Sequence, residues 1–285
     1  MAKKKSKTYQ SYVASAKKAA KKLGTPAATS AYKIEVRFLG GLTTAQKNAF
    51  KAAADRWTKV IVGDLPSIRV DGEVIDDLLI LAQGVNIDGP GGILGQAGPT
   101  HLRPASAGTA KYLPVKGIMS FDTADLADMQ SNGTLKDVIA HEMGHVIGVG
   151  TIWSDKGKLK GAGTLNPRFT GTTAKKEYGK LKHSGPGEVP VENSGGPGTR
   201  DSHWRESVFR NELMSGFIAA PNNPLSRMTA GSLKDMGYKV DLTKAETYAL
   251  PNLLALAASG AVTTHLRPHA LPVIPITLPD DSLVK

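Results

Sequence analysis

Residues 134–150 read TLKDVIAHEMGHVIGVG, and this stretch decides the fold predicted for the whole chain. Thr134 followed by Asp137 has the pattern of a helix N-terminal cap, and Gly148 is placed to end the helix. Apolar residues recur between them at the spacing of one helix face, which predicts that the helix is largely buried. They are Leu135, Val138, Ile139, Val146 and Ile147.

Two histidines on this helix are spaced to share one metal ion. His141 and His145 stand four residues apart, so both imidazoles lie on one helix face, about one turn apart. Glu142 lies between them in sequence and can accept a proton from a metal-bound water as that water attacks a carbonyl. The HExxH pattern therefore predicts a hydrolytic zinc site. The alternative is an amphipathic helix with two surface histidines, and the apolar residues around the motif disfavour it.

A catalytic zinc normally has three protein ligands and one water, so a third ligand is required. The candidates are His183, His203 and the acid Glu177. His183 lies in a stretch rich in lysine and glycine, and Glu177 lies in a helix expected to be exposed. His203 stands beside Trp204, a large apolar anchor, which favours it. Asp201 is close enough in sequence to orient the ring of His203, although a backbone carbonyl could do the same.

The arrangement of these motifs is similar to that of a known family. HEMGHVIGVG at residues 141–150, a long insertion, and SHWRESVFRNELMSG at residues 202–216 resemble the leishmanolysin-type metzincins. The resemblance implies that His203 is the third zinc ligand and that Met214 lies in a turn that forms a floor beneath the metal. Gly148 would be the glycine at which the active-site helix ends. Core packing would also explain Met214, and the two interpretations are compatible.

The region upstream of the helix resembles the sheet of metzincins, including matrixins. The resemblance rests on residues 76–80, 88–97 and 119–122. It implies that residues 92–98 form an edge strand that pairs with an extended substrate backbone. The candidate substrate contacts are Ile93, Leu94, Gly95 and Gln96.

The same stretch bears on the number of metal ions, because matrixins bind structural calcium and a second zinc there. Gln96 stands where the second zinc would need a histidine, so the prediction is one catalytic zinc per chain. Asp88 and Asp122 are candidate ligands for calcium. The simpler interpretation of Asp88 and the glycine that follows it is a turn.

Patterns elsewhere predict an α/β (α+β) fold with a mixed sheet backed by helices. The resemblance implies that this is the twisted sheet of a two-lobed, metzincin-like zinc peptidase. Residues 32–38 alternate between apolar and charged side chains, as in a half-buried strand. Residues 78–81 form the continuous apolar run of a central strand. Thr43 and Gln46 form a capping box ahead of a core-facing helix.

The chain divides into four parts in this interpretation: a basic arm at residues 1–30, an upper catalytic lobe at 31–150, a smaller, loop-rich lower lobe at 151–245 and a tail at 246–285. The arm reads as a lysine- and alanine-rich helix with a linker, and the tail is expected to be extended. The upper lobe would supply the sheet and the active-site helix. The lower lobe would supply His203 and the methionine turn, and its one strong helix signal lies at 226–236.

Composition restricts the classes of protein further. The chain has 285 residues and a net charge of +11, but nine lysines and no acid fall in residues 1–34, so the rest carries only +2 (11 minus 9). This localised charge does not favour a nucleic-acid-binding body, although the arm alone could bind nucleic acid.

The absence of cysteine excludes disulfides and thiolate ligands. No membrane span and no recognisable secretion signal are found, so a cytoplasmic location or leaderless export is expected. Oligomeric state stays open.

The function predicted from the sequence is that of a zinc-dependent endopeptidase acting on extended protein or peptide substrates. Its rivals are a catalytically inactive binding protein stabilised by zinc and a zinc hydrolase of a non-peptide amide. The presence of Glu142 disfavours the first rival, because a structural zinc needs no such acid. Only a panel of substrates separates the second.

Overall fold

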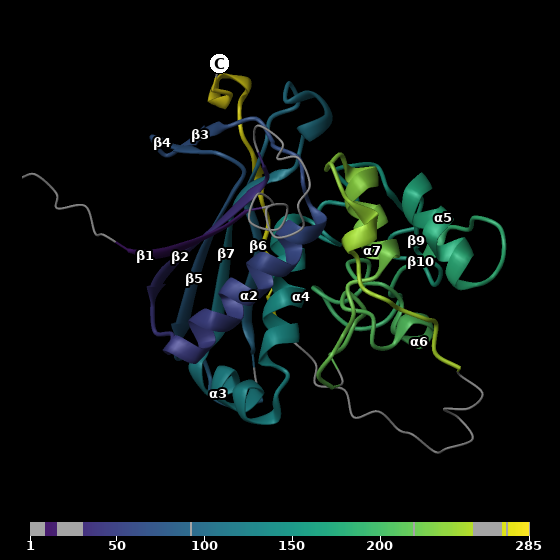
Figure 1. The fold of residues 1–285 in the computed structure, drawn as a ribbon, viewed down its shortest axis with the longest axis horizontal. Coiled ribbons are helices and arrows are strands. Elements are labelled where there is room, and N and C mark those ends of the chain that lie inside the picture. The colour runs from purple at the N-terminus through teal and green to yellow at the C-terminus, as the bar shows by residue number, and fades with distance from the viewer. Residues whose placement is uncertain are drawn as a thin grey trace, which may run out of the picture.

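The computed structural model describes residues 9–15, 31–91, 93–218, 220–252, 270–271 and 273–284. Its main feature is a mixed sheet with two helices on one face (Figure 1). β2, β5 and β7 run parallel to one another, β1 is antiparallel to β2, and β6 is antiparallel to β7. The strands follow one another across the sheet in the order β1 (Gln10–Ser15), β2 (Lys33–Gly40), β5 (Leu78–Val85), β7 (Pro114–Asp122) and β6 (Gly95–Leu102).

The centre of the sheet forms as its sequence patterns predict. Alternate residues of β2 are buried, with Ile34, Val36 and Phe38 facing the core. The apolar run at the start of β5 is buried on both faces, as expected for a strand between two neighbours. A small hairpin of β3 (Ile68–Val70) and β4 (Glu73–Ile75) precedes β5.

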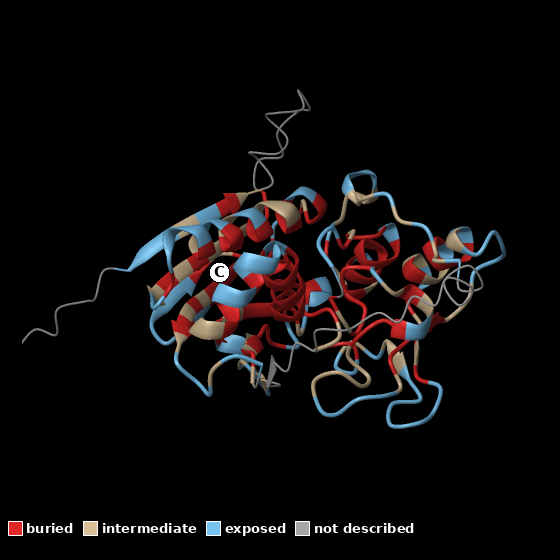
Figure 2. Cartoon of the chain, turned by 90° about the horizontal axis from the view of Figure 1, so that it is seen from below, coloured by how far each residue is buried: buried red, intermediate tan, exposed pale blue. Residues whose placement is uncertain are grey.

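Two helices cover one face of this sheet and pack against each other. α2 (Thr44–Val60) begins with the predicted capping box, in which the Thr43 and Gln46 side chains each accept the other residue's backbone N–H. α4 (Leu135–Ile147) carries the HExxH motif. Trp57 of α2 donates its indole N–H to the Ala140 carbonyl of α4 at 2.9 Å, which links the two helices inside the core. Figure 2 shows buried residues gathered in the interior on both sides of the molecule.

The start of α4 differs from the predicted cap. The Thr134 side chain makes no cap hydrogen bond. The Asp137 carboxylate instead pairs with Arg56 at 3.1 Å and accepts the backbone N–H of Asn222 at 2.6 Å. A further helix, α3 (Thr123–Asn132), precedes α4 and was not expected, because few of its residues are apolar. Its N-terminus is capped by the side chain of Asp122.

The second lobe lies on the other side of α4 from the sheet and contains more regular structure than the sequence suggests (Figure 1). A cluster of aromatic rings in tilted and edge-to-face contact forms its core, and its members are Trp153, Phe169, Trp204 and Phe209. α7 begins and ends as predicted, capped by Ser226 and closed by Gly237. The elements are β8 (Leu159–Lys160), β9 (Arg168–Phe169), α5 (Thr172–Leu181), β10 (Val189–Pro190), α6 (Glu206–Phe209) and α7 (Arg227–Met236).

The two ends of the chain both join the main sheet. The expected N-terminal helix is wrong for residues 10–15, which form β1 and pair with β2. Tyr12 donates its hydroxyl to the carboxylate of Asp55 on α2, and Ala14 is fully buried. The rest of that predicted helix lies outside the described residues.

The tail is extended, as expected, but it is also paired. β11 (Ala270–Leu271) and β12 (Ile276–Thr277) both run parallel to β6 along its outer edge. The described edge of β6 is therefore occupied. No helix among the described residues has the length and apolar character needed to cross a membrane.

Candidate metal centre

The histidines of α4 lie at its buried, C-terminal end. His141 and His145 stand one turn apart on the helix, and neither is exposed by more than 6%. The helix ends at Gly148, whose φ of 115° is in the left-handed region and whose N–H donates to the carbonyls of Gly144 and His145. Glycine adopts this conformation without the steric cost of a Cβ.

A third imidazole, that of His203, meets this pair from the second lobe. The His203 Nε2 atom lies 3.0 Å from the Nε2 of His141 and 2.9 Å from that of His145. The remaining Nε2–Nε2 distance, between His141 and His145, is 3.1 Å. The structure thus brings together three residues that are spread over 63 positions of sequence, and their nitrogen atoms form a compact triangle.

The other nitrogen of each ring shows which tautomer is present. His141 Nδ1 contacts the Leu213 carbonyl at 2.6 Å, and His145 Nδ1 contacts the Val149 carbonyl at 2.8 Å. His203 Nδ1 contacts the Thr199 carbonyl at 2.9 Å. A carbonyl can only accept, so each Nδ1 carries the ring proton and each Nε2 presents a lone pair.

Burial keeps all three rings neutral. Loss of solvation lowers the pKa of His141 to about 3 and that of His145 to about 4. Burial and the two neighbouring histidines hold the pKa of His203 well below its usual value. Three lone pairs about 3 Å apart, with no proton between them, repel one another unless a cation lies among them. The donor set therefore fits a metal ion, and neutral imidazoles of this kind are ligands for zinc.

Met214 packs directly against α4. It is fully buried, and Gly144, between the two histidines of α4, leaves room for it. A Cβ at Gly144 would lie 2.6 Å from the Met214 sulfur and 2.8 Å from the Trp57 ring. The Met214 carbonyl accepts the backbone N–H of Trp204, the residue after His203. Met214 thus lies between α4, which carries His141 and His145, and the segment of the second lobe that carries His203.

A buried acid that the sequence analysis missed holds this turn in place. Glu212 is fully buried, and one of its carboxylate oxygens accepts the backbone N–H of Met214 at 2.6 Å. The other oxygen accepts the N–H and hydroxyl of Ser226 and the hydroxyl of Thr229. These bonds fix the turn on both sides of the Leu213 carbonyl that orients His141. The only signal for this role was an acid beside the apolar residues of the predicted turn.

Glu142 is also buried, but one of its oxygens has no partner. Its exposed fraction is 1%, and Oε2 makes no hydrogen bond to any described residue. Burial alone raises the pKa of the carboxyl group to about 8. An unpaired carboxyl oxygen in a buried site is costly to stability, and Glu142 combines this feature with a place on the helix that carries His141 and His145.

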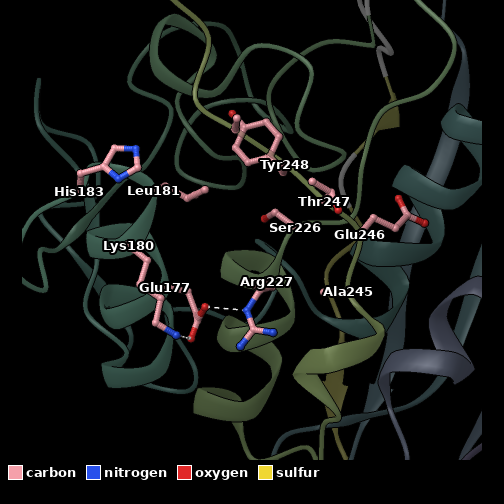
Figure 3. Close-up of a pocket in the computed structure, with 11 residues that line it drawn as sticks. Glu177, Lys180, Leu181, His183, Ser226, Arg227, Ala245, Glu246, Thr247 and Tyr248 are labelled. Atoms are coloured by element: carbon pink, nitrogen blue, oxygen red, sulfur yellow. Dashed lines mark hydrogen bonds and ion pairs between the residues drawn. The ribbon is translucent and has the colours of Figure 1, made fainter.

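The other two candidate ligands lie elsewhere. Glu177, on α5, accepts hydrogen bonds from Arg227 at 2.8 Å and Lys180 at 2.7 Å. It lines a pocket beside α7 together with His183 and Tyr248 (Figure 3). Neither Glu177 nor His183 belongs to the three-histidine cluster.

The orientation of His203 comes from the backbone. The Asp201 carboxylate, predicted as its partner, accepts instead the N–H of Gly163 at 2.9 Å. The Thr199 carbonyl takes the role predicted for Asp201, and the hydroxyl of Ser202 also lies 3.0 Å from His203 Nδ1.

The turn before β6 uses its acids to bind backbone groups. One oxygen of Asp122 accepts the N–H groups of Ile87, Asp88 and Gly89 at 2.6–3.3 Å, and the Asp88 carboxylate accepts that of Ile93. Both carboxylates thus accept backbone N–H groups of this turn, and the turn itself agrees with the simpler interpretation of Asp88 and the glycine that follows it. Ile93 and Leu94 precede β6, while Gly95 and Gln96 begin it.

Gly150 gives a test of how closely the two lobes must approach. A Cβ at Gly150 would lie 1.8 Å from the carbonyl oxygen of Ser202, next to His203. Gly157 also has a positive φ, but a Cβ there would meet nothing within 4 Å. We expect Gly157→Ala to lower the free energy of unfolding by about 1 kcal/mol, the ordinary cost of this backbone conformation. Gly150→Ala should cost several times more and weaken zinc binding. Denaturant unfolding measures the loss of stability, and zinc titration measures the loss of zinc binding. Equal losses of stability in Gly150→Ala and Gly157→Ala would contradict the close contact between Gly150 and Ser202.

The fold and this centre together define a metallopeptidase with a mixed sheet and a metzincin-like arrangement of two lobes. The family model for leishmanolysin matches residues 109–257, slightly more than half of the chain, and the chain belongs to that family of zinc-dependent metallopeptidases. No curated protein matches the chain. The match includes α4, His203 and Met214 but not the strand region at 76–97.

Proposed function

We propose that this chain is a zinc-dependent endopeptidase in which His141, His145 and His203 hold one zinc ion and Glu142 is the general base. The observation that carries the proposal is the triangle of three unprotonated Nε2 atoms, each fixed by a carbonyl behind its ring. Three protein nitrogens leave one position for water, as catalytic zinc sites require.

The residues of the chain divide the chemistry between them. Zinc, when bound, polarises the peptide carbonyl and makes a bound water acidic near neutral pH. Glu142 offers a buried, unpaired oxygen that would accept a proton from the attacking water and deliver it to the leaving amine. A cation held by the three histidines would favour the ionised form of this carboxyl group, which burial alone disfavours.

The supporting residues keep the histidines in position before the metal arrives. The Glu212 network holds the turn that carries the Leu213 carbonyl, and this carbonyl holds the ring of His141. Met214 fills the space beneath Gly144 and limits movement of the helix toward the second lobe. Such preorganisation is what a catalytic site needs from its surroundings.

The proposed substrate is an extended protein or peptide segment bound between an upper lobe at 31–150 and a lower lobe at 151–245. An edge strand binds such a segment through backbone groups, with residues 93–96 beside the reacting bond. A zinc-stabilised binding protein is disfavoured because it would have no use for the unpaired oxygen of Glu142. A non-peptide amidase would be distinguished by a panel of protein, peptide and small amide substrates.

Hydrolysis of an unstructured protein such as casein tests the proposal. Activity should be lost when a chelator removes the metal and should return when zinc is added. Hydrolysis that continues in metal-free protein would contradict it.

A further inference from the structure

The outer edge of β6 is occupied by the C-terminal part of the same chain. Ala270 pairs with Gly95 and Leu271 with Gln96, in parallel orientation. Further along, Ile276 pairs with His101. Figure 1 shows this segment, in yellow, running beside β6. The first of these pairings lies on the residues that an extended substrate is expected to use.

The far end of this segment is anchored firmly. Leu278 donates its N–H to the Leu102 carbonyl at 3.0 Å, and Val284 donates to Ser67 at the same distance. Leu278 and Leu283 pack against a small second core under the β3–β4 hairpin. Residues 278–284 are therefore fixed to the upper lobe, away from the end of β6 where residues 270, 271 and 273 lie.

The other described end of this segment, at Val273, is connected to α4 by three successive contacts. A Cβ at Gly98 of β6 would lie 3.0 Å from the Cβ of Val273. A Cβ at Gly117 of β7 would lie 2.8 Å from the Gly98 carbonyl oxygen and 2.4 Å from Val146. Val146 follows His145 on α4. Val273 thus contacts β6, and the neighbouring strand β7 lies directly against α4.

The pairing at the near end is weak. β11 and β12 contain two residues each, and Pro272 and Pro275 between them have no N–H to donate. Parallel pairing is slightly less stable per residue than antiparallel pairing. Ile274 is 89% exposed and contributes little burial. A longer strand with a full set of N–H groups could therefore displace residues 270–273 while the anchored end stays in place.

We propose that residues 270–271 and 273–278 belong to an internal strap that occupies the strand-pairing edge of β6 and must leave it, at least at residues 270, 271 and 273, before an extended substrate can bind. The inference rests on the proposed peptidase function. A strand edge offers a single row of N–H and C=O groups, so the strap and a substrate cannot use the same residues of β6 together. A tethered competitor acts at high effective concentration and raises the KM for substrate without changing kcat.

A reversible covalent lock tests the strap. The chain has no cysteine, so the double variant Gly98→Cys with Val273→Cys contains only the new pair. The Cβ separation of 3.0 Å is slightly below the usual 3.5–4.5 Å for a disulfide, and a small shift of residue 273 reaches it. Oxidation should lower kcat/KM for an extended peptide at least about 100-fold, and a phosphine reductant should restore it. Each single-cysteine variant is the matched control and should not respond to oxidation.

Zinc content, measured on every sample, separates the ways in which this inference could fail. If the two cysteines do not form a disulfide, residue 273 does not lie against Gly98, and the strap proposal is overturned. Equal activity of the oxidised and reduced forms overturns the strap and leaves the peptidase proposal standing. If the wild type, the single variants and the reduced double variant all hold zinc but hydrolyse nothing, the peptidase proposal fails and the strap fails with it.

Discussion

Replacing Glu142 with alanine should abolish peptide hydrolysis while leaving one zinc bound per chain. Glu142 is buried on the same helix as two of the histidines but contributes no atom to the triangle of nitrogen atoms. Its unpaired oxygen is therefore free to move protons without holding the metal. General acid–base catalysis contributes about 10²–10⁴-fold to a rate, so a loss of kcat in that range is expected.

Glu177→Ala is the matched control for this variant. Glu177 is also a buried glutamate on a helix, but it pairs with Arg227 and Lys180 and lies outside the metal cluster. Its replacement should lower stability and leave kcat for the zinc-loaded protein close to that of the wild type. Measurement of kcat together with bound zinc distinguishes the two variants. Unchanged turnover in Glu142→Ala would exclude it as the general base.

Replacing His203 with alanine should remove both tight zinc binding and activity. The remaining two imidazoles cannot form the three-ligand site that catalytic zinc requires. Loss of an outer partner of a ligand already costs about 10–100-fold in metal affinity, and loss of a ligand should cost more. His183→Ala is the control, because His183 lies in the pocket beside α7 and not at the centre. Zinc affinity and peptide hydrolysis measured for both variants test the assignment. The reverse result would mean that the second lobe has been assigned wrongly.

The sequence predicted the local part of the site because helix geometry fixes it. His141 and His145 lie four residues apart, and the helical repeat alone places them on one face. Gly148 ends the helix for the equally local reason that it adopts a left-handed backbone conformation. The capping box of α2 and the ends of α7 follow the same logic, and all of them match the structure.

The distant part of the site was predicted from local context, the apolar anchor Trp204 beside His203, together with the family resemblance. His203 is separated from His145 by 57 residues, and no periodic pattern spans such a distance. The aromatic cluster around Trp204 positions it, together with backbone pairing of Trp204 with Val191 and Ser215. The carbonyls that orient the three rings have no sequence signature, because every residue has one. For this reason the sequence left two partners open for His203, the Asp201 side chain and a backbone carbonyl, and the structure has the carbonyl of Thr199.

The ends of the sheet were the least predictable features. Lysine- and alanine-rich composition favours a helix, yet residues 10–15 pair with β2 because tertiary contacts outweigh propensity. The prolines of the tail predicted extended backbone but not its partner, since strand pairing is a non-local interaction. This pairing changes how the edge strand is understood, because the edge is occupied by the chain itself.

Titration of metal-free protein with zinc, followed by hydrolysis of an unstructured protein, tests the central claim most directly. One equivalent is expected because the described residues hold a single cluster of three histidines. Activity should be absent without metal, rise in proportion to added zinc and level off at about one equivalent per chain. Glu142→Ala should bind the same equivalent and remain inactive throughout the titration. Full activity before any zinc is added, or none at any zinc loading in the wild type, would contradict the account.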